Sequence, residues 1–176
     1  MNYKKQIIII ICLVLFNTIN IQAQGFVGSG FTYHPIAKTK GANIRFGMTQ
    51  DKIAFYLEYN HFFPGEGKKL YQVGANFNFK WKLAVQVNAK IIGGGFLMRY
   101  KSTKFTSSSL PFSVASSSDN LVGGNIGLGV DVLLSKHFMI FVEGKYTIHK
   151  KVEKNFLFEE ASGQYFIPNI GVAFLF

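Results

Sequence analysis

Large apolar side chains recur at every second position along most of the chain, and the pattern is clearest in residues 164–176. One parity of this stretch carries large apolar residues and a proline, namely Phe166, Pro168, Ile170, Val172, Phe174 and Phe176. On the other parity small residues dominate, and the full set is Tyr165, Ile167, Asn169, Gly171, Ala173 and Leu175. Successive side chains of a strand point to opposite faces, so a period of two predicts a β-strand and excludes a helix.

The same alternation recurs in other stretches, and together they predict strands at 26–33, 42–49, 53–63, 71–81, 83–91, 122–134, 138–148 and 164–176. In the first of them we expect Val27, Ser29, Phe31 and Tyr33 to face outward. Most of these stretches have about the 9–11 residues that a tilted membrane strand needs. An apolar strand at an open sheet edge would invite pairing with another chain, and closing the sheet into a barrel would remove that edge.

The predicted connections alternate in length. Those after the second, fourth and sixth strands are short, with turns expected at 50–51 and around Lys82. Those after the first, third, fifth and seventh are longer, and 93–120 would be the longest loop. This asymmetry is typical of outer-membrane barrels whose termini both lie in the periplasm. The sequence therefore predicts an all-β fold, an eight-stranded antiparallel up-and-down transmembrane β-barrel with both termini periplasmic.

Composition agrees with a membrane strand protein. Of the 176 residues, 48% are hydrophobic and only 16% are charged, whereas about 25% charged residues is usual in a soluble domain. Beyond the first residues, no run approaches the roughly 20 apolar residues of a membrane helix. The length is that of one domain.

Residues 1–23 have the pattern of a secretory signal peptide. Lys4 and Lys5 precede an apolar run at 7–16, and Ala23 offers a small residue for cleavage. The run is too short for a membrane anchor, and Ile11 before Cys12 argues against a lipoprotein cleavage site. We expect a mature barrel domain of residues 24–176, which contains no cysteine.

The leader, the eight alternating stretches and the terminal IGVAFLF resemble the small outer-membrane β-barrel family, with its OmpA/OmpX-type and PorT-like members. The resemblance covers essentially all of residues 24–176 and implies insertion into the outer membrane of a Gram-negative cell. In that family the final aromatic strand is recognised by the barrel-assembly machinery, which implies that role for Val172, Phe174 and Phe176. The scaffold carries adhesins, structural proteins, enzymes and complex subunits, so it implies no single function.

Ionisable residues on the polar parity are expected to meet in the lumen: Arg45, Glu58, Lys80, Lys90, Asp131, Glu143 and Lys145. They could form a path for ions or protons. Because an eight-stranded interior is only wide enough for side chains, we favour a mutually neutralising network over an open pore.

A soluble lipocalin-like barrel is the main structural alternative. It is disfavoured because the polar parity carries mostly Gly, Asn, Gln, Ala and Thr, which suit a crowded interior better than a surface in water.

Catalytic chemistry has little support in the sequence. Some family barrels modify lipid A with His, Ser and an acidic residue, and this chain has four histidines, His34, His61, His137 and His149. His61 is expected on the lipid-facing parity and His137 in a periplasmic turn, both poor places for a base acting in the outer leaflet. His34 is expected at the outer rim, and the dipeptide Ser118-Asp119 is expected in an outer loop. The glycine clusters lack the strand-to-helix context of a phosphate-binding motif. We expect no catalytic, metal or cofactor site.

The formal net charge is +10, and loss of Lys4 and Lys5 would lower it by two to +8. The excess is expected in the outer loops, on Lys38, Lys40, Lys68, Lys69, Arg99, Lys101, Lys104, Lys150, Lys151 and Lys154. Lipopolysaccharide phosphate would be the natural partner, although ordinary solvated loop charge is an equal alternative. Export excludes nucleic acid as a partner.

The sequence thus predicts a non-enzymatic outer-membrane protein with a structural, adhesive or complex-subunit role, and other outer-membrane proteins are candidate partners. A lipid A-modifying enzyme and a narrow channel are the alternatives.

Overall fold

The computed structural model describes residues 23–35, 37–64, 68–106, 113–149 and 163–176, with the side chains of 102–119 left undescribed. The predicted signal peptide therefore lies outside the described residues, apart from Ala23. No helix in the described part of the chain is long and apolar enough to cross a membrane.

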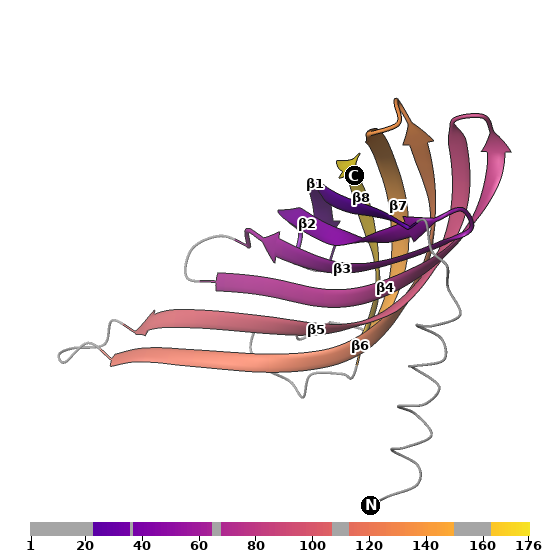
Figure 1. Ribbon diagram of the computed structural model, residues 1–176. Coiled ribbons are helices and arrows are strands. Elements are labelled where there is room, and N and C mark those ends of the chain that lie inside the picture. Colours follow the sequence, from indigo (N-terminus) through magenta and orange to yellow (C-terminus); the bar gives the residue numbers. More distant parts are fainter. Residues whose placement is uncertain (1–22, 36, 65–67, 107–112, 150–162) are drawn as a thin grey trace, which may run out of the picture.

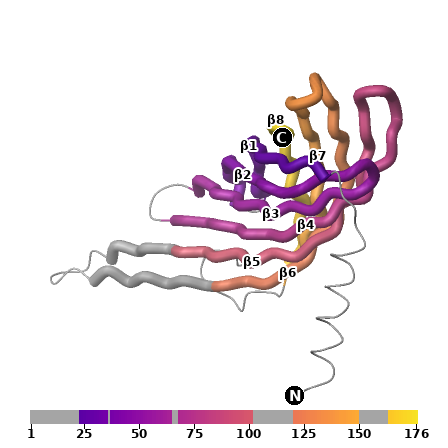
Figure 2. Tube along the Cα trace, in the orientation of Figure 1, coloured from indigo at the N-terminus to yellow at the C-terminus, as the bar shows by residue number. Residues whose placement is uncertain are grey.

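Eight β-strands form one closed barrel in which each strand pairs antiparallel with its neighbours in sequence, and β1 pairs with β8 (Figure 1). The strands are β1 Gln24–His34, β2 Thr39–Gln50, β3 Ile53–Phe62, β4 Lys68–Ala84, β5 Val87–Thr106, β6 Ser113–Leu133, β7 Phe138–His149 and β8 Gln164–Leu175. The predicted eight-stranded antiparallel up-and-down β-barrel is confirmed, and Figure 2 follows the same closed path along the Cα trace.

The connections divide between the two ends of the barrel. We call the end with connections 51–52, 85–86 and 134–137 the turn end. The opposite end, with connections 35–38, 63–67, 107–112 and 150–163, is the loop end. The expected asymmetry holds for most of them, although 35–38 is no longer than 134–137 because β2 begins at Thr39.

Two glycines make the closing seam between β1 and β8 possible. Gly30 is paired with Gly171 across this seam. A Cβ on Gly30 would lie 2.2 Å from the Ile170 carbonyl oxygen, and one on Gly171 would lie 2.2 Å from the Ser29 carbonyl oxygen. Such distances to backbone atoms leave no room for a side chain, so the strands approach closely only because both positions are glycine.

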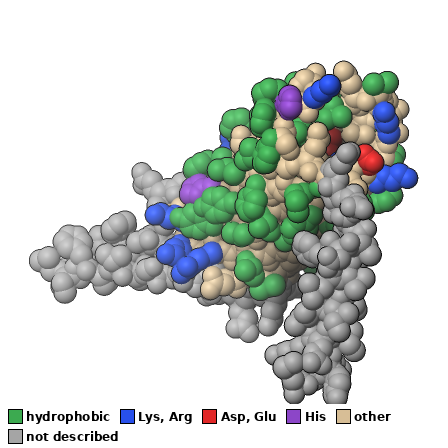
Figure 3. Space-filling view, viewed as in Figure 1, with side chains coloured by type: hydrophobic (Ala, Val, Ile, Leu, Met, Phe, Trp, Pro, Cys, Tyr) green, Lys and Arg blue, Asp and Glu red, His purple; other side chains and the backbone are tan. Residues whose placement is uncertain are grey.

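The barrel is apolar outside and polar within. Val27, Ser29, Phe31 and Tyr33 all face outward, as predicted. Large apolar side chains exposed on the other strands include Phe46, Phe55, Ile91, Leu128 and Ile170, and Figure 3 shows hydrophobic side chains across the visible face of the barrel. Buried Asn, Gln and Thr residues occupy inward positions. A soluble protein has the opposite arrangement, with apolar residues inside and polar residues outside. An apolar exterior around a polar interior is the arrangement of a barrel surrounded by an apolar medium.

Two apolar clusters lie inside the barrel, one toward each end. The turn-end cluster comprises Phe26, Tyr56, Met139, Phe141, Ala173 and Leu175. The loop-end cluster comprises Phe62, Leu70, Phe96, Met98, Tyr100, Leu121, Tyr165 and Ile167. The polar middle of the lumen is therefore flanked by packed hydrophobic side chains.

The prediction of a long loop at 93–120 is wrong, because 93–106 belong to β5 and 113–120 belong to β6. The hairpin remains paired as far as Thr106 and Ser113, beyond Ser102, the last residue of β5 that pairs with β4 (Figure 1). The glycines at 93–95 interrupt the apolar alternation on which the prediction depended. Phe96 and Met98 point inward, into the loop-end cluster, while Leu97 between them is exposed outside, so both faces of the strand are apolar here.

The turn predicted around Lys82 is also misplaced. β4 continues to Ala84 through an irregularity in pairing between Lys82 and Ala84, and the turn residues are 85–86. Leu83 and Val85 continue the apolar alternation across the turn, so the pattern hid it. The preceding turn lies at 51–52 rather than 50–51.

Candidate functional site

Six charged side chains meet in the lumen from five strands. Arg45 comes from β2, Glu58 from β3, Lys90 from β5, Asp131 from β6, and Glu143 and Lys145 from β7. Every one of them is almost fully buried. They point inward because they occupy the polar parity of their strands, where successive residues alternate between lumen and exterior. The sequence-predicted residues are thus brought together, with Lys80 set apart from them as described below.

The two glutamates are the centres of this lumen network. Glu58 pairs with Arg45 at 3.1 Å and with Lys145 at 2.6 Å, and it accepts a 2.8 Å hydrogen bond from Asn60 Nδ2. Glu143 pairs with both Arg45 and Lys90 at 2.7 Å. Each carboxylate therefore has more than one cationic partner, which offsets the cost of removing its charge from water.

The guanidinium of Arg45 is also enclosed by aromatic rings. Its Cζ lies 3.7 Å from the ring centroid of Phe141 and 4.9 Å from that of Tyr56. A planar guanidinium can stack on aromatic faces while its edges bind carboxylates, which a lysine cannot do. The sequence analysis missed these two aromatic partners, although both lie on the inward parity and could have been found there.

Charge balance separates Lys80 from the other lumen cations. Lys90 also binds Asp131, so Arg45, Lys90 and Lys145 match three carboxylates. Lys80 instead donates a hydrogen bond to the Thr49 hydroxyl, and among the described residues it forms no ion pair. The lumen network proper is therefore neutral, and Lys80 adds one positive charge near the turn end.

The four histidines lie at the two ends of the barrel and on its outer surface. His34, expected at the outer rim, is buried at the end of β1, where its ring lies 5.1 Å from Phe62 and 4.5 Å from Tyr165. His61 packs against Tyr71 on the outer surface, and His137 lies in the connection 134–137. His149 lies at the loop end of β7, 5.5 Å from the ring of Tyr165.

The Ser118-Asp119 pair was expected in an outer loop but belongs to β6, where its backbone pairs with β5, and its side chains lie outside the described residues. No group of three or more potential metal ligands is found in the described part of the chain.

The three residues expected to direct assembly lie on the outer face of β8 and at the residue that follows it. Val172, Phe174 and Phe176 are 54%, 42% and 70% exposed. Phe176 exchanges two 2.9 Å backbone hydrogen bonds with Gly25, so the final residue is paired with the beginning of β1. These residues are therefore accessible along one outward row.

The geometry defines a closed eight-stranded barrel of the outer-membrane type, and solved structures share this fold. A major outer membrane protein from Thermus thermophilus is similar with a TM-score of 0.65 and 10% identity, covering 89% of this chain and 100% of that chain. The N-terminal β-barrel domain of Pseudomonas aeruginosa OprF gives 0.57 and 17% identity, covering 88% and 97%. Ail, the attachment invasion locus protein of Yersinia pestis, gives 0.57 and 11% identity, covering 89% and 100%.

At these identities the likeness concerns the fold. No protein-family model and no curated protein matches the sequence.

Proposed function

We propose that this chain is a non-enzymatic integral protein of the outer membrane, with a structural, adhesive or complex-subunit role. The observation that carries this proposal is the combination of an apolar outer face with a filled lumen. The neutral network of Arg45, Glu58 and their partners occupies the middle, and an apolar cluster packs toward each end. A barrel of this kind presents its loops, its outer wall and the two mouths of its lumen as working surfaces, rather than a path through its middle.

The proposed topology places the turn end and both termini in the periplasm and the loop end outside the cell. It is supported by the longer connections at the loop end. Export would use residues 1–23 as a cleaved signal peptide, and the barrel-assembly machinery would then recognise β8. An OmpA/OmpX-type or PorT-like relationship accords with this assignment.

Lipopolysaccharide is the proposed lipid partner at the loop end. Lys40, Lys69 and Arg99 are exposed there, and Arg99 is paired across the sheet with Tyr71. Figure 3 shows basic side chains gathered at this end beside hydrophobic ones. Cations beside outward aromatic rings, here the stacked pair Tyr59 and Tyr71, match a lipid whose phosphates lie at the membrane surface.

The main test measures the conductance of the barrel and the mass of lipid A. Purified barrel in planar bilayers should give no resolved conductance steps, and lipid A from cells with and without the protein should have the same mass spectrum. Discrete conductance would establish the channel alternative, and a mass change in lipid A would establish the enzyme. Capture from native outer membranes would then identify any complex to which the chain belongs.

The lipid partner has a separate test. Lys69→Gln combined with Arg99→Gln should reduce the lipopolysaccharide that copurifies with the barrel. Lys136→Gln at the opposite end is the matched control and should have no effect. Equal lipopolysaccharide content in all three proteins would leave these cations as ordinary solvated charge.

A further inference from the structure

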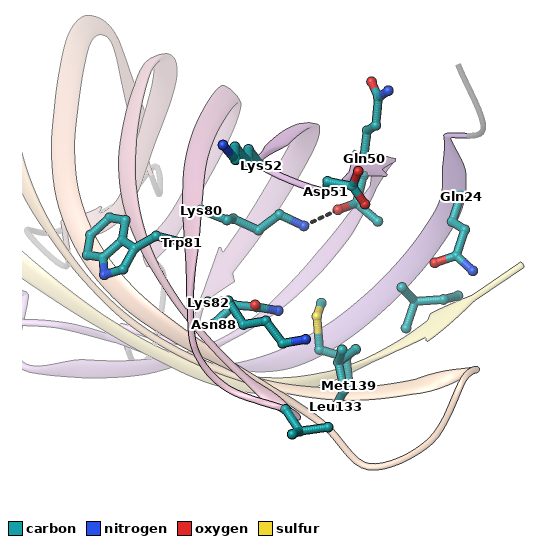
Figure 4. A pocket seen from close by; sticks show the side chains of 13 residues that line it. Gln24, Gln50, Asp51, Lys52, Lys80, Trp81, Lys82, Asn88, Leu133 and Met139 are labelled. Carbon is teal, nitrogen blue, oxygen red and sulfur yellow. Dashed lines mark hydrogen bonds between the residues drawn. The ribbon is translucent and has the colours of Figure 1, made fainter. Parts of the chain in front are cut away.

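A cavity of about 720 Å³ opens at the turn end of the barrel. It lies between the turn-end cluster and the connections 51–52 and 85–86. Its polar wall includes Lys52, Lys80 and Lys82, with Asp51 as the acidic member, and its apolar part includes Leu133, Met139 and Leu175. Figure 4 shows Lys80, Lys82 and Asn88 extending into the same space from the barrel wall.

Among the described residues, Lys80 is a lumen cation that forms no ion pair. Its side chain is 8% exposed, and its described hydrogen-bond partner is a neutral hydroxyl, that of Thr49. The carboxylates of Glu58, Glu143 and Asp131 are already shared among Arg45, Lys90 and Lys145. Asp131 and Asp51 attract the Lys80 ammonium, but neither forms an ion pair with it among the described residues. A largely buried ammonium without a directly bound anion has a high desolvation cost, so this position favours an external anionic partner.

The cavity as a whole has the charge of a phosphate site. Lys52, Lys80 and Lys82 against Asp51 give two excess positive charges among its lining residues. A phosphate monoester carries about −1.5 to −2 charges at neutral pH and has three acceptor oxygens. Lysine ammonium groups and the side-chain amides of Asn88 and Gln24 supply donors for such oxygens.

We propose that this cavity binds a phosphate group through Lys80 and Lys82. The apolar side formed by Leu133, Met139 and Leu175 admits a ligand that carries a hydrocarbon portion beside its phosphate. Two sources share this chemistry, a soluble phosphomonoester and the headgroup of a phosphate-bearing lipid. The site goes beyond the proposed function, and only its assignment to the periplasmic side depends on the proposed topology.

The test uses calorimetric titration of the full barrel in octyl glucoside, a detergent without phosphate. The probes are inorganic phosphate, phenyl phosphate and dihexanoyl phosphatidic acid. Lys80→Met and Lys82→Met should each weaken binding about tenfold, the loss expected for one charge-assisted hydrogen bond. Lys136→Met, an exposed lysine of the connection 134–137, is the matched control and should bind like the unmodified protein.

Saturable binding of inorganic or phenyl phosphate with this variant pattern supports the site with a soluble ligand. Binding of phosphatidic acid alone, with the same pattern, supports it with a lipid headgroup. Failure of all three probes to bind overturns the proposal, as does binding that both Lys→Met substitutions leave unchanged. Lys82 is exposed, so its variant answers the question even if Lys80→Met does not fold.

Discussion

Arg45 on β2 and Glu143 on β7 meet at 2.7 Å in the lumen, although β1 and β8 lie between their strands in the barrel wall. Lys145 on β7 likewise reaches Glu58 on β3 at 2.6 Å. These ion pairs connect strands on different sides of the barrel wall. Backbone hydrogen bonds, by contrast, join each strand only to its two neighbours. The network therefore links strands that the sheet itself leaves unconnected.

Replacing Arg45 with Met should lower the free energy of unfolding by about 3 kcal/mol, because two buried glutamates lose a shared cation. Urea unfolding in lipid vesicles measures this change. The double variant Arg45→Met/Glu58→Met should lose less than the sum of its two single variants, since it removes both members of one pair. Lys136→Met, which alters only an exposed lysine, is the control. Wild-type stability in the single and the double variants would mean that the pair contributes nothing.

Closure of the barrel gives a second prediction. Gly30→Ala should destabilise the closed barrel by about 1–3 kcal/mol, because the new methyl group would lie 2.2 Å from the Ile170 carbonyl oxygen. Gly93→Ala is the matched control, since a Cβ there meets nothing within 4 Å. The heat-induced mobility shift on a denaturing gel, followed over a temperature series, reports the folded barrel. A melting temperature of Gly30→Ala equal to that of Gly93→Ala would contradict this account of the seam.

The sequence was sufficient for the strands and their faces wherever apolar and polar residues alternate. In β2, Ile44 and Phe46 point outward while Arg45 points inward, as the period of two predicts. The alternation stopped being informative at 93–106. Three glycines have no side chain with which to mark a face. Phe96 then packs into an apolar cluster inside the barrel while Leu97 faces outward, so neither face is polar there.

Contacts across the lumen were less accessible to sequence reasoning. Arg45 and Glu58 lie on neighbouring strands at paired positions, so their proximity follows from the register of β2 and β3. The contact of Arg45 with Glu143 depends on the diameter and tilt of the closed barrel, which alternation does not encode. The turn-end cavity likewise depends on where β4 ends. The turn between β4 and β5 was predicted around Lys82 but lies at 85–86.

Topology can be tested with single cysteines, because the only cysteine, Cys12, lies in the predicted signal peptide. A membrane-impermeant maleimide applied to intact cells should label Lys69→Cys at the loop end. It should not label Lys136→Cys at the turn end until the outer membrane is permeabilised. Both lysines are exposed, so a difference in labelling reports the side of the membrane rather than burial. The reverse pattern would place the turn end outside the cell.

The final residue gives the last prediction. Phe176 is 70% exposed on the outer face, and its backbone exchanges two hydrogen bonds with Gly25. Deleting it should cost the finished barrel at most about 3 kcal/mol, so the variant should still refold into detergent micelles. If β8 is the strand that the assembly machinery recognises, the same deletion should strongly reduce the protein in outer-membrane fractions.

Phe138→Ala is the matched control for this deletion, because it removes another outward aromatic ring near the same end and leaves β8 intact. Immunoblots of outer-membrane and periplasmic fractions should show normal insertion of Phe138→Ala and degraded periplasmic protein for the deletion. If the deletion variant reached the outer membrane at the same normal level as Phe138→Ala, the aromatic ring at the end of β8 would be no more important for insertion than the one on β7. The proposed assembly role of Val172, Phe174 and Phe176 would then be lost, while the fold of the barrel would be unaffected.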